Sequence, residues 1–321
     1  MSELSTISLL QGKRLEDTRA FLARHGLSMS EDANYTAQLF EDGALLATGS
    51  LCGNVLKYVA VEESAQREGA CARILSELVS EAYRLGRTHL FLYTKPESAA
   101  IFRSLGFYDV IVAGGIAMLE NRKEGLDAYL SSLQRGTGCQ GAVVMNCAPF
   151  TLGHRYLVEE AARRVDCLHL FVVSEAWGLF SPEKRLAMVQ AGTADIPHVL
   201  LHECGSYLVS AVTFPTYFIK DTCRAEAAQA ELDIALFCQK IAPALSISIR
   251  FVGMEPYCPV TARYNRRLAE ELPRYGLELV ELPRKGGISA GEVRRAIAAN
   301  DWERVRQLVP QSTYEALRSD A

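Results

Sequence analysis

The stretch "GAVVMNCAPFTLGHRYLVEEAA", residues 141–162, joins an apolar run to an amphipathic helical pattern through a short turn. An uninterrupted apolar run is typical of a strand buried on both faces of a parallel sheet. In such sheets, ligands bind beyond the carboxyl ends of the strands, and phosphates lie at the N-termini of the following helices. The turn therefore predicts an anion site. Thr151 offers it a hydroxyl and His154 a ring donor, and Gly153 leaves room for a phosphate chain to approach the backbone.

This stretch opens a longer alternation of strands and helices. Further apolar strands are expected at 168–173, 198–201, 246–253 and 277–282, and helices are expected to begin near residues 153, 181, 224, 261 and 289. Strands that alternate with helices indicate a doubly wound parallel sheet. We therefore expect a Rossmann-like α/β domain over residues 139–321.

The residues before this domain follow another pattern. "YTAQLF" and "ALLATGSL" flank an Asp-Gly pair, which is a strong hairpin signal, and helical and strand patterns then alternate up to a final strand at 107–114. This order favours an α+β domain over residues 1–118. The polar, glycine-ending stretch at 119–138 is interpreted as a linker helix. A chain of 321 residues is also longer than one hydrophobic core usually serves.

Composition excludes several classes of protein. A net charge of −4 gives no general attraction to nucleic acid or to an anionic membrane. The start "MSELSTISLL" lacks the features of a signal peptide, and the longest apolar stretch is too short to span a bilayer, so we expect a cytoplasmic protein. The nine cysteines form no C-x-x-C pair, which favours reduced thiols. We assign no metal site to His198 and His202, which bracket a short strand.

A second helix N-terminus that could bind an anion follows the last strand. "GGISAGEVRRAIAAN", residues 286–300, places Ser289 and Glu292 at the spacing of a capping box. Arg294 and Arg295 then add positive charge near the start of that helix. Taken singly, the two stretches could be a helix cap with a solvated histidine and a pair of surface arginines. Together, two helix mouths suited to anions in one parallel domain favour a polyphosphate ligand.

The two helix N-termini also resemble the motifs of a known family. "PFTLGH" and "ISAGEVR" resemble the paired signatures of the T/H-x-G-H nucleotidyltransferase superfamily, whose members transfer adenylyl groups from ATP. With "VTFPTYFIKD", "EPYCPVTARYN", "VELPRK" and an acetyltransferase-like first domain, the whole chain resembles the citrate lyase ligase family.

The resemblance implies a set of site residues. It places Thr151 and His154 at the α- and β-phosphates of ATP, and Ser289 and Arg294 at the β- and γ-phosphates, with Thr151, His154 and Arg294 as catalytic residues. The further residues that it implies for ATP binding are Asn146, Phe150, Gly153 and Lys220. Mg²⁺ would share in neutralising the phosphates, with no protein ligand to the metal assigned. Gly291 departs from the pattern, because the family usually has Ser or Thr there.

The resemblance also implies a reaction. Acetate would be activated by ATP as acetyl-adenylate with loss of pyrophosphate, and the acetyl group would pass to the thiol prosthetic group on the acyl carrier subunit of citrate lyase. One alternative is a small-molecule adenylyltransferase that forms a dinucleotide cofactor, which would retain AMP in its product. Another alternative is a non-enzymatic module that senses nucleotides or docks the carrier.

The first domain carries its own signature. "VAVEESAQREGACARIL" and "AAIFRSLGF" resemble the acetyl-CoA-binding region of GCN5-type (GNAT) acetyltransferases, and Gln66 and Gly69 match its pyrophosphate loop. Cys71 stands where Gly or Ala is usual, and Phe102 where many members have a tyrosine that acts as general acid. The resemblance thus implies binding of a CoA-type ligand without acetyl transfer. The alternative is a scaffold that binds no ligand.

Overall fold

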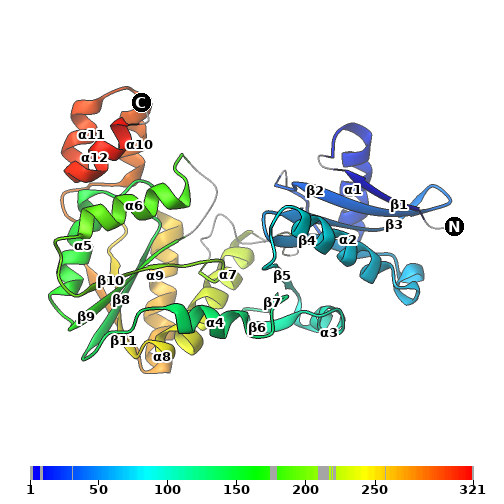
Figure 1. The fold of residues 1–321 in the computed structure, drawn as a ribbon, viewed down its shortest axis with the longest axis horizontal. Helices are drawn as coiled ribbons and strands as arrows, with labels where there is room; N and C mark the ends of the chain where they lie inside the picture. The colour runs from blue at the N-terminus through cyan, green and yellow to red at the C-terminus, as the bar shows by residue number, and fades with distance from the viewer. Residues whose placement is uncertain are drawn as a thin grey trace. The chain divides into compact units, whose positions relative to one another are not determined.

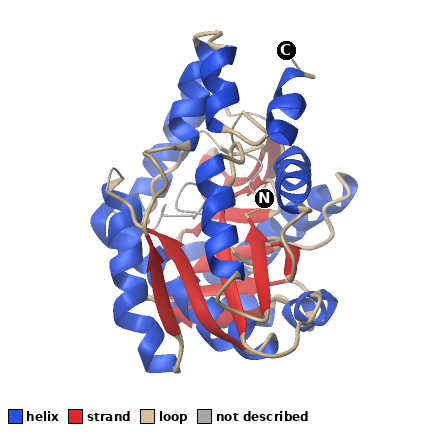
Figure 2. Cartoon of the chain, turned by 90° about the vertical axis from the view of Figure 1, so that its left-hand side faces the viewer, coloured by secondary structure: helices blue, strands red, loops and turns tan. Residues whose placement is uncertain are grey.

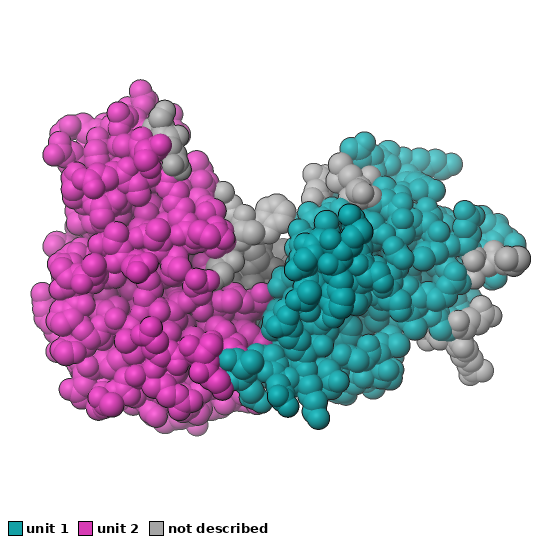
Figure 3. Space-filling model, viewed as in Figure 1, with its two compact units in different colours: residues 1–128, 215–232 teal, residues 129–214, 233–321 magenta. Residues whose placement is uncertain are grey.

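The computed structural model describes residues 3–7, 10–30, 32–173, 179–208, 217, 219, 222–256 and 258–319, apart from the side chains of 66–68 and 222–223. The chain forms two compact units (Figure 3). Unit 1 comprises residues 1–128 and 215–232, and unit 2 comprises residues 129–214 and 233–321. Neither unit is one continuous segment.

Unit 1 is built on a seven-stranded sheet of order β1-β2-β3-β4-β5-β7-β6 (Figure 1). Its strands are β1 (Glu3–Ile7), β2 (Tyr35–Glu41), β3 (Ala44–Cys52), β4 (Val55–Val61), β5 (Phe91–Thr94), β6 (Tyr108–Ala113) and β7 (Ile116–Glu120). Its helices include α1 (Gly12–Arg24), η1 (Glu63–Glu68), α2 (Ala70–Arg84), η2 (Pro96–Ser98), α3 (Ala99–Ser104) and the first half of α4 (Gly125–Ser132), whose second half belongs to unit 2. Among the described strand pairs of this sheet, β4 and β5 are parallel and the others are antiparallel.

Two tight turns of unit 1 bear on the predicted hairpin and on the predicted last strand. Asp42 and Gly43 both have positive φ, 49° and 81°, as a tight two-residue hairpin turn requires, and the predicted β2–β3 hairpin is confirmed. The strand at 107–114 was expected to be the last, and this is wrong. Gly114 and Gly115, with φ of 59° and 73°, make a second tight turn, and β7 follows and pairs with β5 and β6.

Unit 2 is built on a five-stranded parallel sheet of order β10-β9-β8-β11-β12. Its strands are β8 (Gln140–Met145), β9 (Cys167–Val172), β10 (Val199–Glu203), β11 (Ile247–Gly253) and β12 (Glu278–Leu282). The helices of unit 2 and the shared helix α7 are α5 (Leu152–Ala162), α6 (Pro182–Thr193), α7 (Thr222–Leu236), the π-helical turn η3 (Phe237–Ile241), α8 (Ala242–Ala244), α9 (Pro259–Glu271), η4 (Leu272–Tyr275), α10 (Ala290–Ala298), α11 (Trp302–Leu308) and α12 (Gln311–Arg318).

Helices cover both faces of this sheet, as side chains that alternate along β8 show. Val143 and Met145 pack into a core with residues of α5, α6, α10, α11 and α12. Ala142 and Val144 face the opposite core, which α7, η3, α8 and α9 complete. Figure 2 shows the strands in red with these helices in blue beside them. The doubly wound sheet and the α+β first unit are thus confirmed. The chain order places β8 between β9 and β11, where the winding reverses, so the turn after β8 lies at the switch point.

Candidate active site

The turn before α5 holds Thr151 and His154 in one hydrogen-bonded ring. Thr151 is the N-cap of α5, and its Oγ1 accepts a 3.2 Å hydrogen bond from the backbone N–H of His154. In return, the backbone N–H of Thr151 donates to Nδ1 of His154 over 3.1 Å. This is a capping box in which histidine replaces the usual Glu or Gln. His154 is therefore part of the cap rather than a solvated side chain.

The capping box also sets the protonation of His154. Because Nδ1 accepts from the Thr151 backbone, the ring proton of the neutral form resides on Nε2. Burial, and next the positive charge of Arg284, lower the pKa of His154 to about 4. The ring of buried Phe150 stacks on the imidazole, with centroids 5.9 Å apart. His154 is thus a neutral, fixed ring whose Nε2–H is a donor at physiological pH.

The second motif reaches the first across the site. Ser289 is the N-cap of α10, and its Oγ accepts from the Glu292 backbone N–H over 3.1 Å. The Glu292 carboxylate instead accepts from Arg304, so only half of the predicted capping box forms. Arg294 is exposed, and its Nη1 donates to the carbonyl oxygen of Ala148 over 2.6 Å. The structure therefore brings the two sequence motifs together.

Two glycines of this contact region differ in the space around them. A Cβ atom on Gly153 would lie 3.2 Å from the carbonyl oxygen of Ile288, so α5 and the loop before α10 approach closely there. At Gly291, the nearest atoms to an added Cβ are 3.8 Å away, on Ser289, Arg294 and Arg295. That space can accept the hydroxyl side chain usual in the family.

Sequence reasoning missed an ion pair at this mouth. Arg284, which follows β12, forms a salt bridge with Glu255, which follows β11. Its Nε also donates to the carbonyl oxygen of Met254 over 2.9 Å. Glu255 further accepts from the Cys258 backbone N–H. The pair thus holds a guanidinium near His154 by joining two loops that lie 29 residues apart, a proximity that the sequence alone does not reveal.

Asn146 is fixed by a buried arginine. Arg185 of α6 is 1% exposed, and its Nη1 donates to the Oδ1 atom and, over 3.3 Å, to the carbonyl oxygen of Asn146. The Asn146 amide N–H₂ is then directed away from Arg185. Phe150 is fully buried and packs on Gly192, so it supports the site from the core and presents no surface to a ligand.

Three further sequence candidates are Lys220, Gln66 and Gly69. Lys220 lies outside the described residues, as does the side chain of Gln66. Gly69 is in unit 1, where its φ of 73° supplies the left-handed residue at the start of α2, and no side chain caps that helix. The roles of Gln66 and Gly69 at a CoA-type ligand stay predictions.

The histidines of the sheet form a buried pair. His202 of β10 bonds His169 of β9, with 2.9 Å between Nε2 and Nδ1, and His169 in turn bonds the side chain of Gln140. His198 lies just outside β10 with a positive φ. Within the described ranges, no three His, Cys, Asp or Glu side chains gather as metal ligands. None of the helices described combines the length and apolar character needed to cross a bilayer.

Known proteins resemble this chain over nearly its full length. The citrate lyase ligase of Klebsiella pneumoniae is 42% identical, with 98% of this chain and 96% of that protein covered. That of Haemophilus influenzae is 39% identical, with 95% and 96% covered. Among solved structures, Escherichia coli ElaA matches at 14% identity and a TM-score of 0.35, covering 38% of this chain and all of ElaA. Residues 140–317 match the family described as the citrate lyase ligase C-terminal domain, and with these relatives they show that the chain belongs to the citrate lyase ligase family.

Proposed function

We propose that this protein is a ligase that activates acetate with ATP and transfers the acetyl group to the thiol prosthetic group on the acyl carrier subunit of citrate lyase. Its family relatives are ligases whose names give citrate lyase as the protein they act on. The observation that carries the chemistry is the neutral His154 ring, fixed by Thr151, together with Arg294, which bonds Ala148 in the same turn before α5.

The chemistry asks for positioned donors rather than a protein nucleophile. An acetate oxygen attacks the α-phosphorus of ATP, the bond to the bridging oxygen breaks, and pyrophosphate leaves with the electron pair. Charge builds on the phosphate oxygens during this step, and preorganised donors stabilise it most effectively. His154 would donate from Nε2–H, the first turn of α5 would offer backbone N–H groups, and Arg294 would hold the leaving pyrophosphate.

The second step transfers the acetyl group. The acceptor sulfur attacks the carbonyl carbon of acetyl-adenylate, a C–S bond forms, and the C–O bond to AMP breaks. AMP leaves with the electron pair, and the thiol proton passes to solvent. Mg²⁺ also belongs to this proposal. Since no cluster of protein ligands occurs in the described part of the chain, we expect the ion to be held by phosphate oxygens and water, as Mg²⁺ commonly is with nucleotides.

The test is exchange of labelled pyrophosphate into ATP. We expect exchange that requires acetate and Mg²⁺ and needs no carrier protein. Release of free AMP upon addition of the carrier would separate this function from a dinucleotide-forming adenylyltransferase, which retains AMP in its product. No exchange with acetate, together with adenylyl transfer to a mononucleotide, would overturn the proposal.

A further inference from the structure

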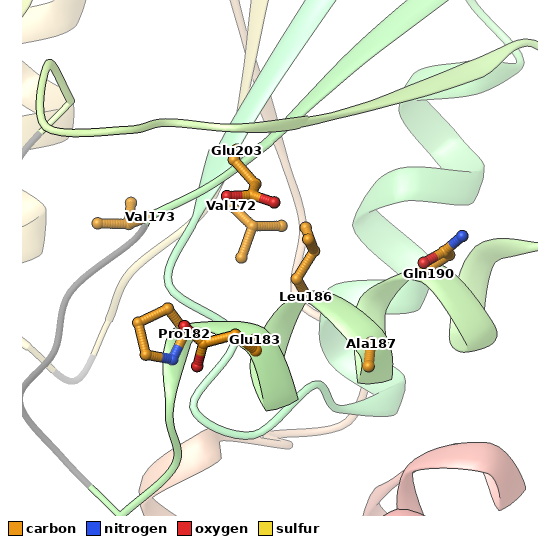
Figure 4. Close-up of a pocket in the computed structure, with 8 residues that line it drawn as sticks. All are labelled: Val172, Val173, Pro182, Glu183, Leu186, Ala187, Gln190 and Glu203. Carbon is orange, nitrogen blue, oxygen red and sulfur yellow. The ribbon is translucent and has the colours of Figure 1, made fainter.

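A cavity of about 170 Å³ lies between the carboxyl ends of β9 and β10 and helix α6 (Figure 4). In Figure 4, Leu186 of α6 and Glu203 of β10 point toward one another across it. Ala187 and Gln190, also in its wall, are exposed. The cavity therefore opens at the surface, and a ligand can enter it without rearrangement of α6.

The wall of this cavity has two kinds of surface. Val172, Leu186 and Ala187 contribute apolar side chains. Glu183 lies on α6 with Leu186 and Ala187, and Glu203 lies on β10 across the cavity from that helix. Neither carboxylate forms a salt bridge within the described ranges. Hydrogen bonds from its own backbone N–H and from Ser181 lower the pKa of Glu183, so its carboxylate is ionised at neutral pH.

These walls select against the charged reactants. Two carboxylates in the wall of the cavity oppose the triphosphate of ATP and the carboxylate of acetate, because like charges repel. Ionised carboxylates only accept hydrogen bonds. The ligand that fits is an uncharged group with N–H or O–H donors and an apolar body.

The position of the cavity connects it to the phosphate site. Val172, in the cavity wall, pairs with Met145, the last residue of β8, so the cavity lies one strand away from the turn before α5. Arg185, on the cavity helix α6, bonds Asn146 in that same turn. A chain held in the cavity could therefore place its end at the reacting phosphate.

Two arginines that can bind phosphates lie on the other side of the switch point. Arg284 and Arg294 follow β12, at the sheet edge opposite β10. ATP is thus drawn toward the β11–β12 side, and the acidic cavity on the β9–β10 side remains for a second, uncharged reactant.

We propose that this cavity binds an uncharged arm with N–H or O–H donors that carries the acceptor thiol, so that its sulfur meets acetyl-adenylate at the N-terminus of α5. This inference rests on the proposed function. It adds a binding site for the acceptor arm to the predicted ATP-binding residues.

The experiment fills the cavity. Ala187→Phe narrows it, while Ala191→Phe makes the same change at an exposed position of α6 outside its wall. Both variants are assayed for acetate-dependent pyrophosphate exchange and for acetyl transfer to the carrier subunit bearing its prosthetic group. For Ala187→Phe we expect the KM for the carrier to rise by about tenfold or more, with the KM for ATP in exchange changed by less than about twofold. Ala191→Phe should match the unmodified enzyme in both assays.

A second measurement distinguishes binding of the arm from binding of the carrier protein's own surface. Carrier subunit without its prosthetic group should inhibit transfer equally well in the unmodified enzyme and in Ala187→Phe, because it lacks the arm. A raised KM for ATP in exchange would show that the cavity holds the nucleotide base and overturn the inference. So would unchanged kinetics in both assays, or weaker inhibition by the arm-free carrier. Absence of exchange in the unmodified enzyme would instead refute the proposed function.

Discussion

The Nη1 atom of Arg294 lies 2.6 Å from the carbonyl oxygen of Ala148, to which it donates a hydrogen bond across 146 positions of sequence. This contact ties α10 to the turn before α5. Because it uses one of the five N–H donors of the guanidinium, the others stay available for phosphate oxygens. Arg294 therefore both closes the site and can bind its ligand.

Replacement of Arg294 should weaken ATP binding. We expect Arg294→Ala to raise the KM for ATP in the exchange assay by about tenfold, since charge-assisted bonds to phosphate are among the strongest polar contacts. Arg295→Ala, which removes the neighbouring exposed arginine, is the matched control and should change this KM little. Equal effects from the two variants would show that only general positive charge is needed.

Replacement of His154 tests its two roles separately. His154→Ala should lower the exchange rate by about 10²–10³-fold, the usual loss for a donor aimed at developing charge, and destabilise the fold by about 1 kcal/mol because the Thr151 backbone N–H loses its acceptor. His154→Gln keeps an acceptor for the Thr151 backbone, so its unfolding free energy should stay near that of the unmodified protein while the rate still falls. A folded His154→Ala enzyme with near-normal exchange would contradict the assignment.

Arg284 should control the protonation of His154. Burial is the larger cause of the lowered pKa of His154, and the Arg284 charge adds to it. In Arg284→Met the loss of that charge makes protonation less costly, so the pKa should rise from about 4 toward 6.5 and the acid limb of the exchange rate should move to higher pH. An NMR titration of the His154 ring measures this directly. Lys285→Met is the control, and an unmoved titration in Arg284→Met would refute the coupling.

Gly291 should tolerate the hydroxyl that the family usually has. In Gly291→Ser the added Cβ meets no atom closer than 3.8 Å, and Ser is a better helix former than Gly. We expect unfolding by denaturant to show a gain of a few tenths of a kcal/mol, about the difference in propensity, and the KM for ATP to fall. A raised KM would mean that the missing side chain leaves room that the ligand uses.

The buried pair of His169 and His202 should make stability depend on pH. Burial lowers the pKa of each to about 4, below the value of 6.5 in an unfolded chain. The unfolded state therefore binds protons at higher pH than the folded state. The stability is fully present above about pH 6.5 and is lost as the pH falls toward 4, by up to about 1.4 kcal/mol per pH unit for each ring. Denaturant melts across this range should give a smaller slope for His169→Gln, and an unchanged slope would exclude the pair as the cause.

Local patterns predicted the elements of this fold well. Apolar runs marked all five strands of the parallel sheet, and Ser289 marked the start of α10, because these signals lie within a few residues of one another. The strand β7 was missed because the strand ending at Gly114 was expected to be the last one, whereas Gly114 and Gly115 form a turn. A pair of glycines can follow the last strand of a domain or form a tight turn between two strands. Here the pairing of β7 with β5 shows that it forms a turn.

The site was predictable only in part, because local sequence gives residue types but not the contacts between distant segments. The residue types at Thr151, His154 and Arg294 indicated a phosphate site. The exchange of hydrogen bonds between Thr151 and His154 depends on a ring orientation that no spacing specifies. The Arg284–Glu255 pair and the cavity beside Leu186 arise where separate strands end together, so they follow from the sheet order rather than from local sequence.

Helix α7 starts in one unit and finishes in the other, with residues 222–232 assigned to unit 1 and the remainder to unit 2. The segment before it also belongs to unit 1. There Tyr217 lies with its ring centroid 4.8 Å from that of Tyr58, and it donates a 3.0 Å hydrogen bond to the carbonyl oxygen of Tyr93. A gene fragment that began at residue 139 would encode Tyr217 without either partner, and its complement would lack a piece of its own packing. Neither half of the chain can therefore be exchanged as one continuous segment. A recombinant that preserves both units must keep the three points where the chain passes between them, after residues 128, 214 and 232.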